Sequence, residues 1–410
     1  MVVTKKSDVE STLCLFFGYF LIALGISPLT TTMFPQIGNL IEPFLLVGVI
    51  SVNKYGCSRI PFRDTFLDKK CLFLINILLI FAIIGILTPS IIIHNNNDGI
   101  LKLVYADFRS CFLFGYSLLL FINRKWRIEE KVVFLKRVIW IVIIMGFIAT
   151  YNKIQANILG VNDVERLLGI PVHYLVIQTY LYCREQKYIP CVLLLVLGAY
   201  YAVFSFARIN IFFFVMQLFT FFFSLVFSKN NSLWQSLFKK TSIVLVIASL
   251  FYIIPKAYDF YSSSEAGKAQ INRLTDENEG ERKSSLIAPF TDIDFYIYPE
   301  GLGWRNHIEK ISRHYNYKIV STQDSCWLYL FYHFGFIVGL IINILIFRYI
   351  IYNYKYYLSH ISMNTILLGF LLLAFLMGYF TQGIYFTVPQ NAVAGGIMLF
   401  LISKKNNNKY

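Results

Sequence analysis

Arg208 is the residue whose surroundings point most directly to chemistry. It lies in the short polar stretch 205–210 (SFARIN), between two long apolar runs. A charge beside hydrocarbon is costly, so such an arginine either extends toward water from a helix end or has a function. A turn this tight would hold the guanidinium at the mouth of a helix bundle. Guanidinium groups bind phosphate oxygens in a bidentate manner, so a phosphate ligand is the chemistry to consider.

A second group of basic residues follows in the polar segment 256–323. Some of these side chains are explained by a solvated loop near anionic lipid headgroups. Together with Arg208 they could instead form a basic chamber that suits a diphosphate. Gly301 and Gly303 could bring backbone close to the ligand there. The basic residues are Arg273, Arg282, Lys283, Arg305, Lys310 and Arg313.

Gln323 and Asp324 stand where this segment gives way to another apolar run. Asp324 is suited to cap the helix that starts there. It is also suited to take a proton or to orient an acceptor hydroxyl, and the two roles are compatible. His307 and His314 are the alternative bases.

Charged residues also stand inside or beside other apolar runs. Asp107 and Arg109 are two residues apart, so they do not face each other on a helix, and each needs a partner or an aqueous cavity. Arg166 stands at the start of a further apolar run. It is either an ordinary arginine at a helix end or a residue that contacts substrate. Glu165 beside it fits ordinary first-turn capping.

Two further polar residues lie within apolar runs. Glu42 could pair with an intramembrane arginine. His173 follows Pro171 and is interpreted as a hydrogen-bonded core histidine rather than a catalyst.

Metal and disulfide chemistry have no motif in this sequence. The seven cysteines fall mostly within apolar runs or at their ends, and none forms a CxxC or CxxH pair. Such spacings are the usual signature of zinc sites and disulfide frameworks. We therefore expect neither a zinc site nor a disulfide framework, and no cofactor is expected.

Composition indicates the elements that must position these residues. The 410 residues are 57% hydrophobic and only 15% charged. Soluble domains are nearer one quarter charged, and an apolar run of about 20 residues crosses a bilayer as a helix. The sequence therefore predicts an all-α polytopic membrane protein. Its twelve predicted spans are 11–28, 34–52, 71–93, 103–122, 132–150, 164–182, 189–206, 209–227, 241–256, 324–347, 362–380 and 386–403.

The distribution of basic residues predicts the orientation of these spans. Most of the 37 Lys and Arg residues lie on one set of connections, whereas the short connections on the other side hold few. Cytoplasmic loops are the basic ones, so both termini are predicted to be cytoplasmic. The same distribution explains the net charge of +14 without a nucleic-acid partner.

Four parts of the chain follow from this pattern. Residues 1–255 hold spans one to nine, and 256–323 form one large periplasmic loop. Residues 324–403 hold spans ten to twelve, and 404–410 form a cytoplasmic tail. A loop of this length within a compact protein usually binds or covers something.

Three stretches in order resemble one family of membrane enzymes. Residues 205–211 resemble a Ser-x-x-Arg turn before a long apolar helix. Arg282 followed by 299–303 (PEGLG) is similar to a loop pattern of an arginine, a spacer and Pro-x-Gly-x-Gly. Residues 323–328 (QDSCWL), leading to 334–339 (FGFIVG), resemble a His-Asn/Asp-x-x-Leu stretch and its glycine-containing helix. The chain thus resembles the O-antigen polymerase and ligase superfamily, over residues 200 to 345.

The resemblance implies a function and a set of partners. It implies a GT-C-like membrane glycosyltransferase of the Wzy type, in the bacterial inner membrane. The enzyme would transfer a growing glycan from undecaprenyl diphosphate onto a lipid-linked repeat unit at the periplasmic face. It would use no nucleotide sugar or metal, and a chain-length regulator protein would be its partner. Catalytic roles fall on Arg208, Arg282 and Asp324. Substrate binding falls on Arg109, Arg166, Arg273, Gly301, Gly303, Arg305, His314 and Gln323.

One departure bears on the choice within this superfamily. Ligases of the family usually carry a histidine where this chain has Gln323, which favours polymerase over ligase. A lipid-linked oligosaccharide flippase is the alternative from another class, although no repeated halves are visible in the sequence. A membrane acyltransferase is a third alternative, but the sequence has no convincing histidine–acid pair within a predicted span.

Overall fold

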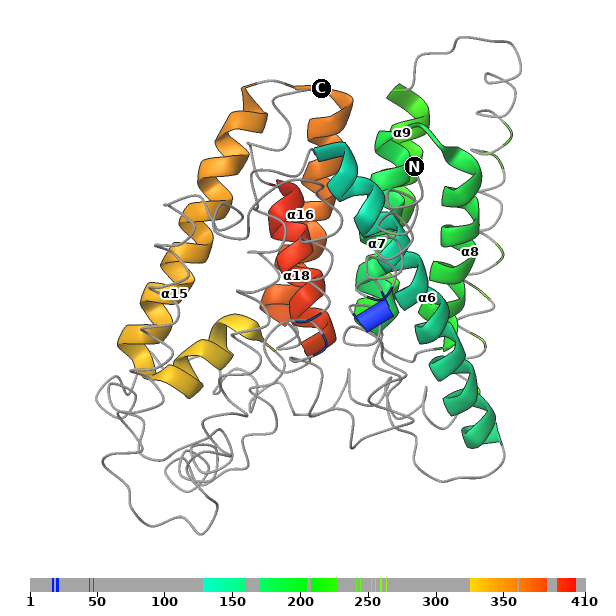
Figure 1. The fold of residues 1–410 in the computed structure, drawn as a ribbon, viewed down its shortest axis with the longest axis horizontal. Helices are drawn as coiled ribbons and strands as arrows, with labels where there is room; N and C mark the ends of the chain where they lie inside the picture. The colour runs from blue at the N-terminus through cyan, green and yellow to red at the C-terminus, as the bar shows by residue number, and fades with distance from the viewer. Residues whose placement is uncertain are drawn as a thin grey trace, which may run out of the picture.

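The described part of the protein is helical. The computed structural model describes residues 128–158, 170–204, 208–227, 325–359, 361–381 and 389–402, together with isolated positions between 17 and 47 and between 241 and 263. Within these ranges every regular element is an α-helix, and no strand occurs (Figure 1). The prediction of an all-α protein is confirmed for this part.

Seven helices are defined, and each coincides with one of the predicted spans. They are α6 (Ile128–Ile158), α7 (Ile170–Arg184), α8 (Tyr188–Phe204), α9 (Arg208–Phe227), α15 (Cys326–Leu358), α16 (Met363–Thr381) and α18 (Pro389–Ile402). Apart from those isolated positions, the other predicted spans, the predicted periplasmic loop and the tail lie outside the described residues. The count of twelve spans therefore stays a prediction.

Two of the described helices are long and apolar enough to cross a membrane. They cover Ile209–Phe227 and Met363–Thr381, with 19 residues each. At a rise of about 1.5 Å per residue such a helix is about 28 Å long, close to the thickness of the hydrocarbon core. The apolar stretches Tyr188–Ala202 and Val393–Ile402 are shorter.

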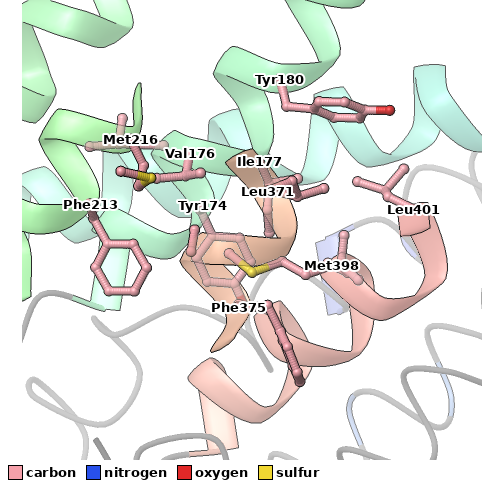
Figure 2. Packing of buried hydrophobic residues seen from close by; sticks show 14 of the residues in the cluster. Tyr174, Val176, Ile177, Tyr180, Phe213, Met216, Leu371, Phe375, Met398 and Leu401 are labelled. Carbon is pink, nitrogen blue, oxygen red and sulfur yellow. The ribbon is translucent and has the colours of Figure 1, made fainter. Parts of the chain in front are cut away.

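The centre of the described bundle is α7. Its side chains at Tyr174, Leu175, Ile177 and Leu181 are fully buried. It packs against α6, α8, α9, α16 and α18. Figure 2 shows part of this core, where Met398 of α18 lies near Tyr174. Burial on all sides explains why α7 has no polar face.

By contrast, α8 lies at the edge of the described bundle. Ile189, Val192, Leu193 and Val196 are all at least two-fifths exposed. A helix that exposes apolar side chains in a row is typical of a surface covered by lipid.

The relative directions of the helices follow from side-chain contacts. Thr179 pairs with Gln217, and Cys183 pairs with Ser224, so α7 and α9 are parallel. Leu194 pairs with the same Gln217, and Tyr188 pairs with Ser224, so α8 is antiparallel to both.

The second half of the bundle has the same alternation. Asn343 contacts Tyr379, and Tyr354 lies beside Gly369, so α15 and α16 are antiparallel. Tyr349 bonds to Leu399, and Tyr357 bonds to Ile402, so α15 and α18 are parallel.

The two halves are linked where α16 packs on α7. In Figure 2 Ile177 lies at the level of Leu371, and Tyr174 lies at the level of Phe375, so α7 and α16 are antiparallel. Consequently α7, α9, α15 and α18 share one direction, and α8 and α16 have the other. The predicted order of spans requires this alternation.

Two helices are longer than the sequence predicts. The predicted span at 324–347 ends near Arg348, but α15 continues to Leu358, because Tyr349 and Tyr357 donate hydroxyl bonds to the end of α18 at 3.3 and 2.9 Å. The predicted span at 132–150 lies inside the 31-residue α6. Lys136 lies inside this predicted span, and its buried side chain forms an ion pair with Glu185.

Candidate functional site

Arg208 is the first residue of α9, as the tight-turn interpretation requires. Helix α8 ends at Phe204, so only residues 205–207 separate the two antiparallel helices. The backbone of Arg208 therefore lies at the end of the bundle where α8 finishes. Its side chain lies outside what the structure describes.

The position of α9, which starts at Arg208, relative to α7 and α8 is fixed by hydrogen bonds further along the helix. The Gln217 Nε2 donates to the Thr179 hydroxyl at 2.8 Å and to the Leu194 carbonyl at 2.9 Å. Gln217 is fully buried, so these bonds offset the cost of burying its Nε2 group, whereas its Oε1 accepts no hydrogen bond from the described residues. The same side chain thus connects α9 to both α7 and α8.

A glycine allows this contact to be so close. A Cβ atom built on Gly198 would collide with the Gln217 Oε1 and would lie 3.1 Å from the Phe214 ring. Small residues at helix crossings are the usual device for close approach in membrane bundles. The position of α9 against α8 therefore depends on Gly198.

Helix α15 opens one residue later than the sequence predicts. Its N-cap is Ser325, with φ −153° and ψ 123°, and Cys326 is the first helical residue. The interpretation of Asp324 as the N-cap is therefore wrong, since that residue directly precedes the cap. The Ser325 hydroxyl makes no capping bond, although the residue is buried.

The starts of α9 and α15 lie at the same end of the bundle. The two helices are parallel and are separated by α16, which packs on both of them. Arg208 begins one of them, and Ser325, the neighbour of Asp324, caps the other. Each helix N-terminus carries a partial positive charge, so this end favours an anion.

Most of the predicted site residues lie outside the described part of the chain. This holds for Arg109, Arg166, Arg273, Arg282, Gly301, Gly303, Arg305, His314, Gln323 and Asp324. Their roles and their mutual distances stay predictions. Within the described residues no cluster of His, Cys, Asp and Glu could hold a metal ion.

His173 is a core residue, as predicted. Its side chain is buried and lies edge-on to Phe213, with ring centroids 4.4 Å apart. The three described cysteines are free thiols, and two of them, Cys183 and Cys191, have sulfur atoms 3.5 Å apart.

The sequence reasoning missed several buried polar residues near this end of the bundle. Asn343 and Tyr379 are buried and joined by a 2.5 Å hydrogen bond from the Tyr379 hydroxyl to the Asn343 Oδ1. An asparagine inside the apolar run 337–347 was a usable signal, because polar residues in membrane helices rarely lack a role. Gln217 in the run 209–227 carried the same signal.

Comparison of the chain with protein-family models, with curated proteins and with solved structures finds no match.

Proposed function

We propose that this protein is a surface-polysaccharide polymerase of the Wzy type. It transfers a growing glycan from undecaprenyl diphosphate onto a lipid-linked repeat unit, at the outer face of the plasma membrane. The observation that carries the proposal is that Arg208 and Ser325 begin parallel helices at the same end of one bundle. This arrangement is compatible with a single site that contains both the Arg208 turn and the 323–328 stretch, as the family resemblance implies.

The proposed chemistry uses charge and proton transfer without a metal. The acceptor hydroxyl attacks the sugar carbon bound to the donor diphosphate, and that carbon–oxygen bond breaks. Arg208 and Arg282 stabilise the negative charge that develops on the leaving diphosphate. Asp324 takes the proton of the acceptor hydroxyl.

The remaining predicted residues serve binding in this proposal. Arg273, Arg305 and His314 lie in the outer loop with Gly301 and Gly303, and they hold the diphosphates. Gln323 contacts the acceptor. Arg109 and Arg166 line the outer mouth.

The proposal includes a cellular location. The chain crosses the inner membrane many times, with both termini in the cytoplasm. A chain-length regulator protein is its partner. The apolar helices α9 and α16 support membrane insertion.

The test is a gene deletion in the bacterium that encodes the protein, followed by electrophoresis of its surface lipopolysaccharide. The deleted strain is complemented with the native gene, Arg208→Ala, Asp324→Ala or the control Arg348→Ala, whose arginine is exposed near the middle of α15. Polymerase function predicts that the ladder collapses to core plus one repeat unit in the deletion and in the first two variants.

A different electrophoresis pattern would contradict the proposal. Bare core without any repeat unit would overturn the proposal and would indicate a ligase or a flippase. Immunodetection of each variant in the membrane fraction controls for loss of the protein.

A further inference from the structure

The first turns of α15 fold back on the rest of the same helix. The Asn343 Nδ2 donates a hydrogen bond to the Trp327 carbonyl at 3.2 Å. In a straight helix these residues, sixteen positions apart, would be separated by about 24 Å. The chain therefore bends sharply between them, and Figure 1 shows the yellow start of α15 at a steep angle to its orange remainder. We call Cys326–Phe331 the N-terminal arm.

Gly339 is the point at which the arm touches the main part of α15. A Cβ atom at this position would lie 2.8 Å from both the Leu330 carbonyl oxygen and the Phe331 nitrogen. Both atoms are backbone, so they cannot move aside as a flexible side chain could. Only glycine allows this contact.

Asn343 connects the arm to two other parts of the bundle. Its Nδ2 also donates to the Gly339 carbonyl at 2.8 Å, and its Oδ1 accepts the 2.5 Å bond from the Tyr379 hydroxyl of α16. Asn343 is 5% exposed and Tyr379 is fully buried. A buried polar network is stable only when its members are satisfied, and here the amide uses both of its ends.

An aromatic cluster covers this network. Trp327 of the arm lies 5.9 Å from Phe331 and 6.4 Å from Phe380, measured between ring centroids. Phe347 lies 5.9 Å from Tyr379 and 5.7 Å from Phe380. The arm is thus packed onto α16 as well as bonded to Asn343.

The cap at the start of the arm adds no hydrogen bond of this kind within the described residues. Ser325 is buried and is the N-cap, but its hydroxyl bonds to no partner in the part of the chain that the structure describes. A capping serine would normally fix the first turn through such a bond. Among the described residues, the polar and close backbone contacts that hold the arm are those of Asn343, Tyr379 and Gly339.

We propose that Asn343 and Tyr379 are positioning residues that hold the N-terminal arm and thereby fix where Asp324 points. Only Ser325 separates Asp324 from the arm, so a rotation of the arm is expected to move Asp324 and Gln323. The role of Asp324 rests on the proposed function, whereas the holding of the arm does not.

The position of the arm can be measured without any assay of activity. Cys326 lies in the arm and is fully buried. Native protein in membranes is treated with N-ethylmaleimide, and labelled cysteines are located by peptide mass spectrometry. Cys183 and Cys191, buried elsewhere, are internal references. Tyr379→Phe is expected to label Cys326 about fivefold to tenfold faster, as loss of one buried hydrogen bond implies. Asn343→Leu removes three hydrogen bonds and is expected to increase the labelling rate at least as much.

Two matched controls separate this effect from general loosening. Tyr357→Phe removes a buried tyrosine hydroxyl that donates to the Ile402 carbonyl at 2.9 Å, far along α15. Gly369→Ala adds a methyl group where the nearest heavy atom is 4.0 Å away, whereas Gly339→Ala meets backbone. Labelling of Cys326 is expected to rise in Gly339→Ala and to stay at the native rate in both controls.

Turnover of the lipid-linked repeat unit gives the second readout, measured per folded protein. Misplacing Asp324 is expected to lower kcat about 10-fold to 100-fold in Tyr379→Phe and Asn343→Leu. The KM for the donor is expected to stay unchanged, because the arginines that hold the diphosphate are not on the arm. A purely structural role would lower the yield of folded protein and leave kcat intact.

The outcomes separate the two proposals. Native labelling of Cys326 in all variants would overturn the holding of the arm. Faster labelling with unchanged kcat would overturn the link between the arm and Asp324. If native protein forms no polymer at all, the proposed function and that link both fail, and the labelling still decides whether Asn343 and Tyr379 hold the arm.

Discussion

Gln186 shows at single-residue scale how a helix of this protein ends. Its φ is +58°, and it is the one non-glycine residue with positive φ among those that the structure describes. The Gln186 nitrogen donates to the Cys183 carbonyl and the Lys187 nitrogen to the Tyr182 carbonyl, both at 3.0 Å. This pair of bonds is a Schellman motif, in which the left-handed position usually belongs to glycine.

Gln186→Gly is therefore expected to stabilise the protein by about 0.5–1 kcal/mol, because glycine has no Cβ to strain this backbone. The measurement is thermal unfolding in detergent. Gln186→Ala keeps the Cβ and serves as the control. Equal melting temperatures for the glycine variant and the native protein would contradict the strain.

Glu185 beside it joins two helices through charge. It pairs with Lys136 of α6 and lies 3.1 Å from Lys187, and the Lys136 ammonium also lies 4.8 Å from the centre of the Tyr182 ring. Burial raises the pKa of the Glu185 carboxyl, but the hydrogen bonds and charges of the two lysines outweigh it. The net result is a pKa below its ordinary value of 4.5.

Glu185→Gln is expected to cost about 1–2 kcal/mol at pH 7, because Lys136 loses its partner while remaining buried. Since the folded-state pKa is lowered, this stabilisation is complete above pH 4.5 and is lost as pH falls through the lowered value. Unfolding of both proteins between pH 7 and pH 3 tests the sign. Lys187→Gln, at an exposed lysine, is expected to cost under about 0.5 kcal/mol. A difference that grows on acidification would contradict this account.

Some positions of single residues were predictable from the sequence. Arg208 and His173 are where the apolar pattern placed them. The N-cap of α15 was placed one residue early, because Asp324 and Ser325 are both good capping residues and sequence does not separate them.

At the scale of elements, the contact of α8 with α9 offers a sharp test. Gly198→Ala is expected to cost about 1–3 kcal/mol, because the new methyl group displaces the Gln217 amide from Thr179 and Leu194. Gly369→Ala is the matched control and is expected to be neutral or to gain up to about 1 kcal/mol from helix propensity. Thermal unfolding of both variants in detergent decides the matter. Native stability in Gly198→Ala would mean that the two helices are not packed this closely.

Some helix boundaries were predictable for a local reason. Helix α16 starts at Met363 because Ser362 and Thr365 cap it reciprocally, with the Ser362 nitrogen 2.6 Å from the Thr365 hydroxyl. The predicted span began one residue earlier, at 362.

The bend of α15 was not predictable in this way. The contacts that hold it join residues nine and sixteen positions apart, and a third partner, Tyr379, lies on another helix. Periodicity reports which face of a helix is apolar, and it carries no information about such tertiary contacts.

At the scale of the whole molecule, the parallel directions of α7, α9, α15 and α18 agree with the predicted alternation of spans. This alternation places the Arg208 and Ser325 ends together, although 117 positions of sequence separate Arg208 from Ser325. Sequence could predict the shared end because alternation needs only an ordered count of spans. It could not predict the distance between the two ends, which depends on how α16 separates α9 from α15.

The most direct test of the central claim uses purified protein in liposomes with an undecaprenyl-diphosphate-linked repeat unit. A chelator is present, and no nucleotide sugar is added. A polymerase is expected to produce longer lipid-linked glycans and to release one free undecaprenyl diphosphate for each transfer, at a rate about 100-fold lower in Arg208→Gln and Asp324→Asn. Unchanged repeat units with correctly inserted native protein would contradict it.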